Sequence, residues 1–411
     1  MERTILHCDM NNFYASVECM LNPKLKGHPV AVCGSTEERH GIVLAKNYEA
    51  KAFGVSTGEV VWQAKQKCRD LVIAPPHYEE YIKYSRLARE IYSRYTDLIQ
   101  PFGMDECWLD VSGSTHIFGS GFDIAEEIRK TIKFELGLTI STGVSFNKIF
   151  AKLGSDMKKP DAITCIYKDT FKEKIWNLPA SDLLGVGRAT KMKLNYYGIY
   201  TIGELANSSP EFLRKIFGKN GVLLWHYANG TEQSEVTPND FEVPIKSVGH
   251  GITTVRDLEK NEDVWPVILE LSQDIGKKLR KYGKRAAGVA IDIRDSELHH
   301  NQWQCQLPQP TYSSLYLARK AFTLFKQSYM WNRDIRSITV RAINLVSEEL
   351  PQQIGLFADE QNIDKMERLE IVIDNIRERF GKNAIKNAVL CQDIGMKAMT
   401  SKLTMPTGLC R

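Results

Sequence analysis

Three acidic residues stand beside apolar runs and have the chemistry of a divalent-cation site. Asp9 follows a short apolar run, and the adjacent Asp105 and Glu106 precede the mostly apolar run from Cys107 to Val111. Carboxylates in apolar surroundings carry a high desolvation cost unless a cation neutralises them. Carboxylate oxygens suit Mg²⁺, and a pair of such ions can promote phosphoryl transfer. For each acid taken alone, the alternative is a turn or a cap, positions that Asp favours.

The composition is typical of a soluble globular protein with more than one domain. A chain of 411 residues is too long for one hydrophobic core and indicates about two to four domains. Hydrophobic residues make up 43% and charged residues 25%. The formal net charge of +4 permits a polyanionic partner without requiring one.

Cysteine usage and the N-terminus point to a reduced compartment. The nine cysteines are scattered and form no C-x-x-C pair, so we predict neither a zinc site nor a disulfide framework. Reduced thiols favour the cytoplasm. A single basic residue, Arg3, precedes the first apolar run, which is not the pattern of a signal peptide. No apolar stretch of about 18 residues occurs, so we expect no membrane span.

The acids need a fold that brings residue 9 to residues 105 and 106. Apolar periodicity predicts, in order, strand 4–9, helix 13–21, helix 77–98, a hairpin of 99–102 with 107–111, helix 122–136 and strand 138–144. With residues 22–75 as an insertion, this order is β-α-β-β-α-β, a ferredoxin-like sheet. That topology pairs the first strand with the hairpin and places Asp9 near Asp105.

The remaining segments differ in character. The insertion contains a predicted strand pair, 29–33 and 41–45, and a helix near 57–68. Short helices with glycine turns fill residues 168–235, and 239–244 is a candidate linker. Residues 246–348 return to mixed strands and helices, with strands at 287–293 and 335–345. A last helix carries Ile363, Met366, Leu369, Ile373, Ile376 and Phe380 largely on one face and ends at Gly381.

Five motifs in order resemble the Y-family, or translesion, DNA polymerases of the bacterial DinB/UmuC type. They are DMNNFYASVE at 9–18, NYEAKAFGV at 47–55, DECWLDV at 105–111, FAKLGSDMKKP at 150–160 and LGVG at 184–187. The resemblance covers roughly residues 4 to 350.

The resemblance implies an α+β multidomain fold shaped like a right hand. Its expected parts are a ferredoxin-like palm (1–21 and 76–167), small fingers (22–75), a helical thumb with a helix-hairpin-helix turn (168–238), a mixed α/β little finger (239–350) and a C-terminal tail with a clamp-binding motif and an amphipathic helix (351–411).

The same resemblance implies a DNA-directed DNA polymerase that adds deoxynucleotides to a primer 3′ end. Two Mg²⁺ ions would be held by Asp9, Asp105, Glu106 and the carbonyl of Met10. Short fingers imply low-fidelity translesion synthesis, and hence a role in DNA repair, mutagenesis and the SOS response. The implied partners are primer-template DNA, deoxynucleoside triphosphates and the replication sliding clamp, and we expect a monomer.

Several residues map onto the family's nucleotide site. Tyr14 corresponds to the steric gate, the aromatic residue that blocks a ribose 2′-hydroxyl, and the alternative is a core aromatic. Tyr48, Lys51 and Lys159 correspond to triphosphate-binding positions. Lys51 stands where the family usually has Arg, so bidentate recognition is lost and a point charge remains.

A second departure is Ala45, which replaces a frequent hydroxyl residue. Lys46 beside it could compensate. For Lys46 and Lys51, the alternative is a solvated lysine.

Three groups of residues map onto the contacts with DNA or the clamp. The glycine turn would let a backbone approach phosphates, and basic positions on the little finger would meet the DNA backbone. The DNA set is Gly185, Gly187, Arg188, Lys277, Lys278, Arg280, Lys281, Arg336 and Arg341. The clamp-binding set is Gln353, Leu356 and Phe357. The alternatives are a simple helix-connecting turn, a solvated charged face, and a linker with a buried Leu-Phe pair.

Two other functions compete with the polymerase. A catalytically inactive DNA-binding scaffold of the same fold would be expected to lack the metal carboxylates, all three of which are present. A nucleotidyl cyclase can share the palm topology. It would not need the turn at Leu184, the Lys159-Pro160 context or a further DNA-gripping domain.

Overall fold

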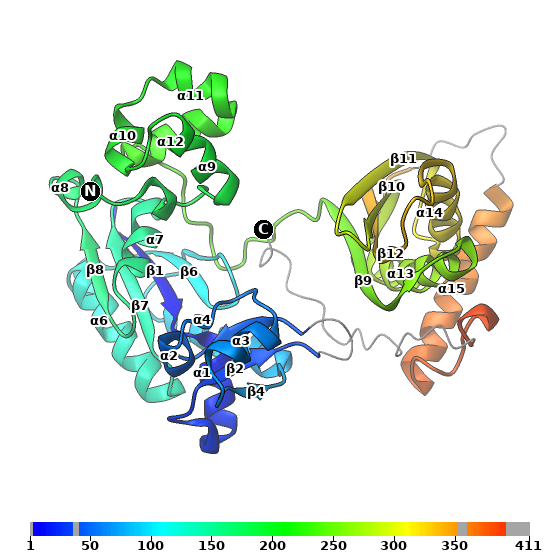
Figure 1. The fold of residues 1–411 in the computed structure, drawn as a ribbon, viewed down its shortest axis with the longest axis horizontal. Coiled ribbons are helices and arrows are strands. Elements are labelled where there is room, and N and C mark those ends of the chain that lie inside the picture. The colour runs from blue at the N-terminus through cyan, green and yellow to red at the C-terminus, as the bar shows by residue number, and fades with distance from the viewer. Residues whose placement is uncertain (1–2, 36–40, 352–359, 392–411) are drawn as a thin grey trace. The chain divides into compact units, whose positions relative to one another are not determined.

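The computed structural model describes residues 3–35, 41–351 and 360–391 (Figure 1). These residues form two compact units, one of residues 3–34 and 42–243 and one of residues 244–351 and 360–391. Within the described ranges, no helix combines the length and the apolar character that a membrane crossing requires.

The first unit is built on a five-stranded sheet. In chain order its strands are β1 (Ile5–Met10), β5 (Ile99–Pro101), β6 (Glu106–Asp110), β7 (Ile140–Ser145) and β8 (Ile163–Ile166). Their order in the sheet is β5-β6-β1-β7-β8. β1 runs antiparallel to both β6 and β7, as a β-α-β-β-α-β chain requires. The predicted ferredoxin-like sheet is therefore confirmed, with β8 added parallel to β7.

Alternation along β1 assigns its side chains to two layers. Leu6, Cys8 and Met10 lie in the core formed with two helices, α4 (Tyr78–Tyr92) and α6 (Gly121–Thr131). His7 and Asp9 point to the other face, where α7 (Lys148–Met157) packs. The face that α7 covers is therefore the face that receives polar side chains from β1.

Close contact between α7 and the sheet depends on a glycine in β7. A Cβ atom at Gly143 would lie 1.9 Å from the carbonyl oxygen of Ala151 in α7. Because backbone atoms cannot move aside as a flexible side chain can, only glycine fits this contact. The contact brings the helix that carries Lys152 and Ser155 directly over β1.

Two predicted helices differ in their ends. The helix predicted over 77–98 ends at Tyr92, because local hydrogen bonds replace the helical ones. The Ser93 hydroxyl donates to the Glu90 carbonyl, and the Thr96 hydroxyl accepts from the Leu98 amide. The helix predicted near 57–68 begins at Val61, after Gly58 with φ of 86°.

A smaller three-stranded sheet lies between α1 (Phe13–Leu21) and α4 in the sequence. Its strands are β2 (Val30–Cys33), β3 (Val43–Lys46) and β4 (Val72–Ala74), and its helices are α2 (Tyr48–Ala52) and α3 (Val61–Lys67). Asn47 joins them: its Oδ1 accepts from the amides of Val30 and Ala50, and its Nδ2 donates to the carbonyl of His28. This one side chain both caps α2 and ties the helix to β2.

Five short helices complete the first unit, as the glycine-rich segment predicted. They are α8 (Phe171–Ile175), α9 (Arg188–Tyr196), α10 (Ile202–Asn207), α11 (Pro210–Phe217) and α12 (Lys219–Ala228). They share one hydrophobic core, which also receives Phe150 and Leu153 of α7.

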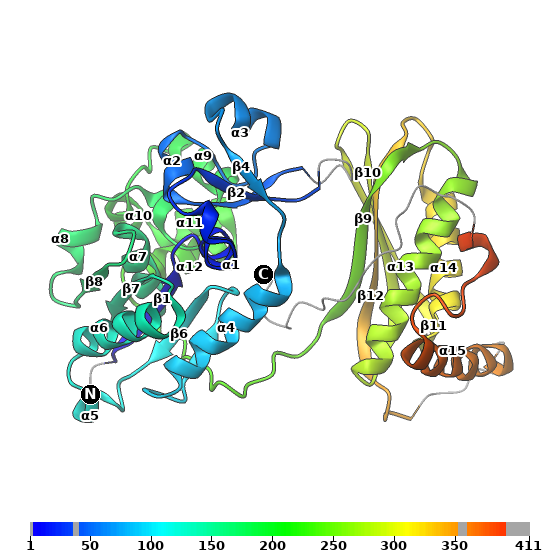
Figure 2. The same ribbon diagram turned by 90° about the horizontal axis from the view of Figure 1, so that it is seen from below.

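The second unit is a four-stranded sheet covered on one face by two helices (Figure 2). Its elements are β9 (Ser247–Leu258), α13 (Asn261–Lys281), β10 (Lys284–Asp295), β11 (His300–Thr311), α14 (Ser314–Ser328) and β12 (Ile335–Ser347). The order β11-β10-β12-β9 is antiparallel throughout. Ile338, Val340 and Ala342 of β12 lie in the core with α13 and α14.

The last helix, α15 (Glu360–Phe380), contacts this unit through three acidic side chains, Glu367, Glu370 and Asp374. Its predicted end is confirmed by Gly381, which has φ of 92°. The predicted packing face is only partly correct. Ile363 is buried, but Leu369 and Phe380 of the apolar stripe are 57% and 69% exposed.

Glu370 is the principal contact of α15. Its carboxylate accepts hydrogen bonds from the backbone amides of Ser314 (2.8 Å) and Leu315 (3.1 Å), and from the hydroxyls of Ser313 and Ser314. It also pairs with Arg280 at 2.7 Å. A residue of α15 therefore caps the N-terminus of α14, where a negative charge is favourable.

α15 also contacts Arg280, one of the predicted DNA-contacting residues. Arg280 also pairs with Asp374 at 2.7 Å and its side chain is only 12% exposed. Neighbouring Arg285 pairs in the same way with Glu367 at 2.9 Å. Arg280 therefore belongs to an intramolecular ion network in this structure, and its predicted contact with DNA would require these ion pairs to open.

Replacing Glu370 by Ala tests this network. The variant removes the cap of α14 and one partner of Arg280, so we expect the helix packing to weaken by about 2–3 kcal/mol. Amide hydrogen exchange should then rise in α14 and α15. Glu378→Ala, on the exposed side of the same helix, is the matched control. Unchanged exchange in the Glu370 variant would show that the network contributes nothing to docking.

Candidate active site

The three acidic residues meet at one edge of the central sheet. Asp9 of β1 lies directly opposite Glu106 of β6 in the antiparallel register. Asp105 immediately precedes β6, and its carbonyl accepts a hydrogen bond from the Met10 amide at 3.0 Å. Residues 96 positions apart in the chain are thus neighbours, because the sheet order places β1 beside the hairpin.

Two lysines of the 150–160 motif bind these carboxylates. Lys152 Nζ lies 3.0 Å from Glu106 Oε1 and 3.7 Å from Asp9 Oδ2. Lys159 Nζ lies 2.7 Å from Asp9 Oδ2, and both lysines also contact Asp156. Like charges facing each other across two strands repel. The ammonium groups offset that repulsion between Asp9 and Glu106.

Burial and mutual repulsion give the three acids different pKa values. Burial, followed by repulsion from Glu106, raises the pKa of Asp9 to about 7 against the opposing charge of Lys159. The same two causes raise the pKa of Asp105 to about 6. Burial alone would also raise the pKa of Glu106, but the His7 contact and the Lys152 ammonium lower it to about 2. The site therefore retains negative charge that two lysines do not fully neutralise.

His7 connects the carboxylates to α7. The ring is fully buried, with Nδ1 2.8 Å from Ser155 Oγ and Nε2 3.6 Å from Glu106 Oε2. The Ser155 hydroxyl donates to the Lys152 carbonyl, so its oxygen is left to accept from Nδ1–H. Burial lowers the pKa of His7, and the contact with Glu106 opposes that shift.

The donor set at this edge fits a divalent cation. Among the described residues, no three His, Cys, Asp or Glu side chains already surround a common point as metal ligands would. Lys152 and Lys159 instead occupy carboxylate oxygens of Glu106 and Asp9. The available donors are all hard oxygens, the kind that Mg²⁺ prefers. Cation binding would require these carboxylates to turn away from the lysines.

The predicted triphosphate-binding residues lie on α2 and on the loop after α7. Lys51 Nζ is 5.6 Å from the centre of the Tyr48 ring, and the Lys51 side chain is exposed. Burial raises the pKa of Tyr48, and both Lys159 and Asp9 act on it electrostatically. Lys46 donates to the Thr57 hydroxyl at 3.0 Å. Burial and then the Lys51 charge lower the pKa of Lys46. Lys51 and Lys159 therefore contribute positive charge around Tyr48.

Tyr14, the predicted steric gate, lies in an aromatic cluster at the start of α1. Its ring stacks on Tyr81 of α4 with centroids 4.1 Å apart and planes at 9°. Tyr78 meets both rings edge-on. Phe13, beside Tyr14, is 3% exposed and packs in the core.

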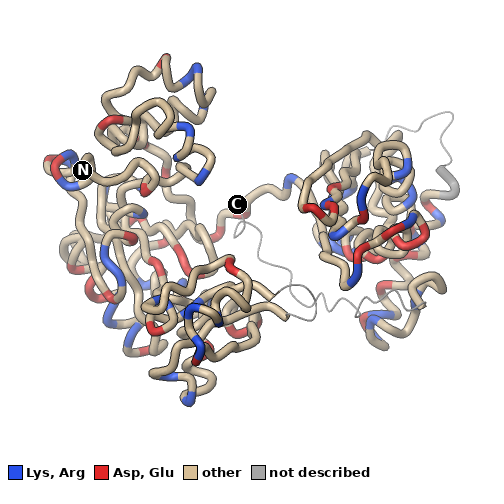
Figure 3. Tube along the Cα trace, in the orientation of Figure 1, with Lys and Arg blue, Asp and Glu red and all other residues tan. Residues whose placement is uncertain are grey.

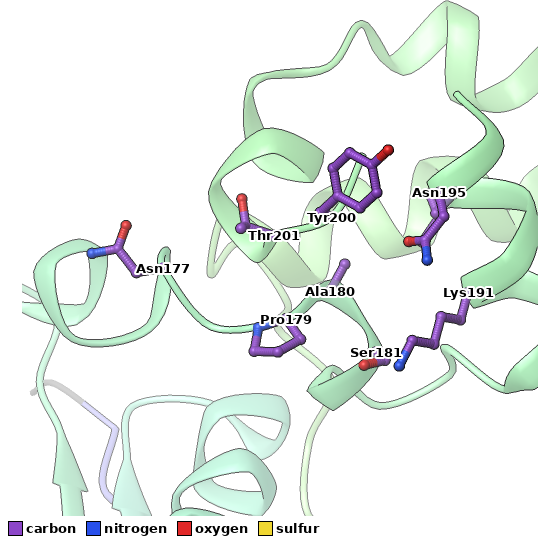
Figure 4. A pocket seen from close by; sticks show the side chains of 9 residues that line it. Asn177, Pro179, Ala180, Ser181, Lys191, Asn195, Tyr200 and Thr201 are labelled. Carbon is purple, nitrogen blue, oxygen red and sulfur yellow. The ribbon is translucent and has the colours of Figure 1, made fainter. Parts of the chain in front are cut away.

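The predicted glycine turn precedes α9. Gly185 has φ of 91°, which favours glycine, and Gly187 is the N-cap of α9. Arg188 and Lys191 are exposed on the first turns of that helix. Lys191 also lines a pocket of about 280 Å³ with Asn195, Tyr200 and neighbouring residues (Figure 4). The turn and its helix therefore present backbone amides and basic side chains to the surface.

The predicted DNA contacts of the second unit fall on different faces. Lys277 and Lys281 are exposed on α13, whereas Lys278 pairs with Asp274 at 2.7 Å. Arg341 lies on the sheet face opposite α13, alternating with core residues of β12. The structure thus does not bring the helix cluster and Arg341 together.

Arg341 lies across the neighbouring strand β9. A Cβ at Gly249 would come within 2.5 Å of Arg341 Cγ, so the glycine leaves room for this side chain. Arg336 stands at an irregularity in the pairing of β12 with β9, and its carbonyl accepts from Thr254. Basic and acidic residues are interleaved over both units (Figure 3). The clamp-binding set of Gln353, Leu356 and Phe357 lies outside the described residues.

Sequence reasoning did not assign roles to Lys152, Asp156 and His7. The first two stand inside the quoted 150–160 motif at i, i+4 spacing, which places them on one helix face toward the acids. His7 stands two residues before Asp9 on a predicted strand, and period-2 alternation puts both on the same face. These two spacings are the sequence patterns that could have identified Lys152, Asp156 and His7.

Comparison with known proteins places this chain in a family. Residues 8–156 match the impB/mucB/samB family, and residues 245–356 match the C-terminal domain of that family. The chain is 51% identical over 396 residues to a protein named DNA polymerase IV from Acetivibrio thermocellus, covering 96% of this chain and 99% of that one. It is 35% identical to DNA polymerase IV 1 of Bacillus subtilis, covering 93% and 92%.

A solved structure shows the same fold. A Y-family DNA polymerase chimera of Dbh and Dpo4 matches with a TM-score of 0.75 at 23% identity, covering 84% of this chain and 99% of that one. The expected α+β multidomain fold of a right-hand polymerase is therefore confirmed. The chain belongs to the impB/mucB/samB family, the Y-family of DNA polymerases.

Proposed function

We propose that this protein extends a DNA primer on a template and does so with low fidelity, as translesion synthesis requires. The observation that carries the proposal is the meeting of Asp9, Asp105 and Glu106 at one sheet edge, within reach of two lysines. Family membership supplies the reaction class, a nucleotidyl transfer from a deoxynucleoside triphosphate to a primer end. The division into palm, fingers, thumb and little finger at the boundaries given above is part of the proposal.

In this proposal Asp9, Asp105, Glu106 and the Met10 carbonyl hold two Mg²⁺ ions. The ions would lower the pKa of the primer 3′-hydroxyl and neutralise charge on the triphosphate and the leaving pyrophosphate. The chain itself supplies position and charge. Lys159, released from Asp9, is within reach of the incoming phosphates, and catalysis needs no protein nucleophile.

Lys51 and Tyr48 complete the proposed triphosphate site from α2. Asn47 fixes that helix to β2, so both side chains are presented from a rigid element. The single ammonium of Lys51 offers weaker geometric control than the guanidinium common in the family. Small fingers that hold the triphosphate with less geometric control favour tolerance of damaged or mispaired template bases.

Asp105→Asn is the direct test of the polymerase. The variant keeps the side-chain shape and removes a charge needed for cation binding. We expect primer extension to fall about 1,000-fold, equivalent to about 4 kcal/mol. Asp70→Asn, on an exposed position, should extend normally. Absence of extension by the unaltered protein would favour an inactive scaffold, and a cyclic nucleotide product without DNA would favour a cyclase.

The raised pKa values of Asp9 and Asp105 predict pH-dependent cation binding. Mg²⁺ binds ionised carboxylates, so its affinity should rise as pH increases through about 6 to 7. Without cation, the folded state holds these protons more tightly than the unfolded state. The stability that the two acids contribute therefore falls as pH rises from about 4, the ordinary pKa of Asp, to about 7, the higher of the two folded pKa values. The Mg²⁺-induced increase in melting temperature should therefore grow between pH 5.5 and pH 8 (about the range the two pKa values define).

Asp9→Asn provides the control for this measurement, because it removes the acid with the higher pKa. Its Mg²⁺-induced increase in melting temperature should be smaller and less dependent on pH. An equal increase at all pH values in the unaltered protein would contradict the assignment of these acids as cation ligands.

We also propose that residues 353–357 bind the sliding clamp. Leu356 and Phe357 would enter an apolar pocket of the clamp, as short extended peptides do. The double variant Leu356→Ala/Phe357→Ala should lose clamp-stimulated synthesis and retain clamp-independent primer extension. Stimulation at the unaltered level would exclude this segment as the docking site.

A further inference from the structure

The proposed steric gate is one member of an ordered aromatic stack. Tyr14 lies flat on Tyr81, while Tyr78 approaches both rings edge-on at centroid distances of 6.1 and 5.7 Å. Tyr81 is fully buried, so its ring is a fixed surface under Tyr14. A stacked pair of this kind restricts the tilt of the half-buried Tyr14 ring more than general packing does.

Tyr81 is held in turn by the carboxylate of Glu18. The Tyr81 hydroxyl donates to Glu18 Oε1, and the amide and ring Nδ1 of His77 also lie within hydrogen-bond distance of that carboxylate. Glu18 is 3% exposed. A buried carboxylate is stable only when such donors surround it, so Glu18 fixes the Tyr81 hydroxyl at one point.

Tyr14 and Glu18, which both contact Tyr81, belong to the same helix. Tyr14 and Glu18 stand four residues apart on α1, hence on one side of the helix. Tyr81 spans them from α4: its ring meets Tyr14 and its hydroxyl meets Glu18. His77 is the N-cap of α4, so the same carboxylate also fixes where that helix begins. The position of the Tyr14 ring therefore depends on the contact between α1 and α4.

We propose that Tyr81 and Glu18 are positioning residues that set how strongly this polymerase rejects ribonucleotides, by holding Tyr14 in the space that a 2′-hydroxyl would occupy. This inference rests on the proposed role of Tyr14 as the steric gate. Rejection of a small hydroxyl needs a ring placed to within a fraction of an ångström, and a loosened ring can move aside. Neither Tyr81 nor Glu18 needs to touch the nucleotide for this effect.

The test compares the ratio of kcat/KM for a deoxynucleotide to kcat/KM for the matching ribonucleotide. Tyr81→Leu removes the ring and its hydroxyl but keeps apolar bulk, and should lower the ratio about tenfold. Tyr81→Phe and Glu18→Gln keep the side-chain shapes but remove or weaken the hydrogen bond between the Tyr81 hydroxyl and the Glu18 carboxylate. Each should lower the ratio about threefold. The value for the deoxynucleotide should change much less, because the carboxylate site is untouched.

Tyr92→Phe is the matched control. Tyr92 is a buried tyrosine of the same helix, and its hydroxyl has no hydrogen-bond partner among the described residues. Its loss should leave the ratio unchanged. A ratio that falls equally in Tyr92→Phe would show that the effect reports general loosening of α4, and would overturn the proposal.

A double variant separates this inference from the role of Tyr14. If Tyr14 is the gate, Tyr14→Ala lowers the ratio, and adding Tyr81→Leu to it lowers the ratio no further. If Tyr14→Ala leaves the ratio unchanged, the gate assignment itself fails. If Tyr14→Ala lowers the ratio but Tyr81→Leu and Glu18→Gln do not, only the positioning role fails. Melting curves of each variant confirm that all are folded.

Discussion

Repulsion between carboxylates that must share one pocket is the constraint on which the first unit depends. Asp9 and Glu106 are forced together by strand pairing, and Asp105 is the residue before Glu106. Lys152 and Lys159 make this arrangement tolerable by placing ammonium groups on the same oxygens that a cation would use. The glycine contact between β7 and α7 is part of the same solution, since it brings Lys152 over the sheet. The packing of α7 on the sheet therefore also supplies the positive charge that the three acids need.

This positive charge explains why a site for cations is stable without them. The lysines neutralise only part of the negative charge. Asp9 and Asp105 lower the rest because their raised pKa values let them hold protons more tightly. A divalent ion that displaced these protons and ammonium groups would be attracted by all three carboxylates at once. In the proposed reaction Lys159, freed from Asp9, would bind the incoming phosphates, so one residue would serve both charge states of the site.

Much of this architecture could be predicted from local pattern, because the pattern and the tertiary contacts agree. Alternation in β1 and the hairpin order were enough to bring residue 9 to residues 105 and 106. Contacts made by polar side chains between distant elements were not predictable. Glu370 gives no local sign that it caps α14, and nothing around Arg280 shows that its partners lie about 90 residues later. The helix cluster and Arg341 lie on opposite sides of the second unit, because α13 covers one face of the sheet and the strand period sends Arg341 to the other.

The acidic side of α15 has a consequence for how this polymerase can be divided. The family's C-terminal domain ends at residue 356, just before this helix. A fragment cut at that boundary would keep Arg280 and Arg285 but lose Glu367, Glu370 and Asp374. Both guanidinium groups would lose these carboxylate partners, and such a fragment would adsorb to polyanions more strongly than the intact protein does. Affinity for DNA measured on the excised domain would then describe a surface that the whole chain keeps covered.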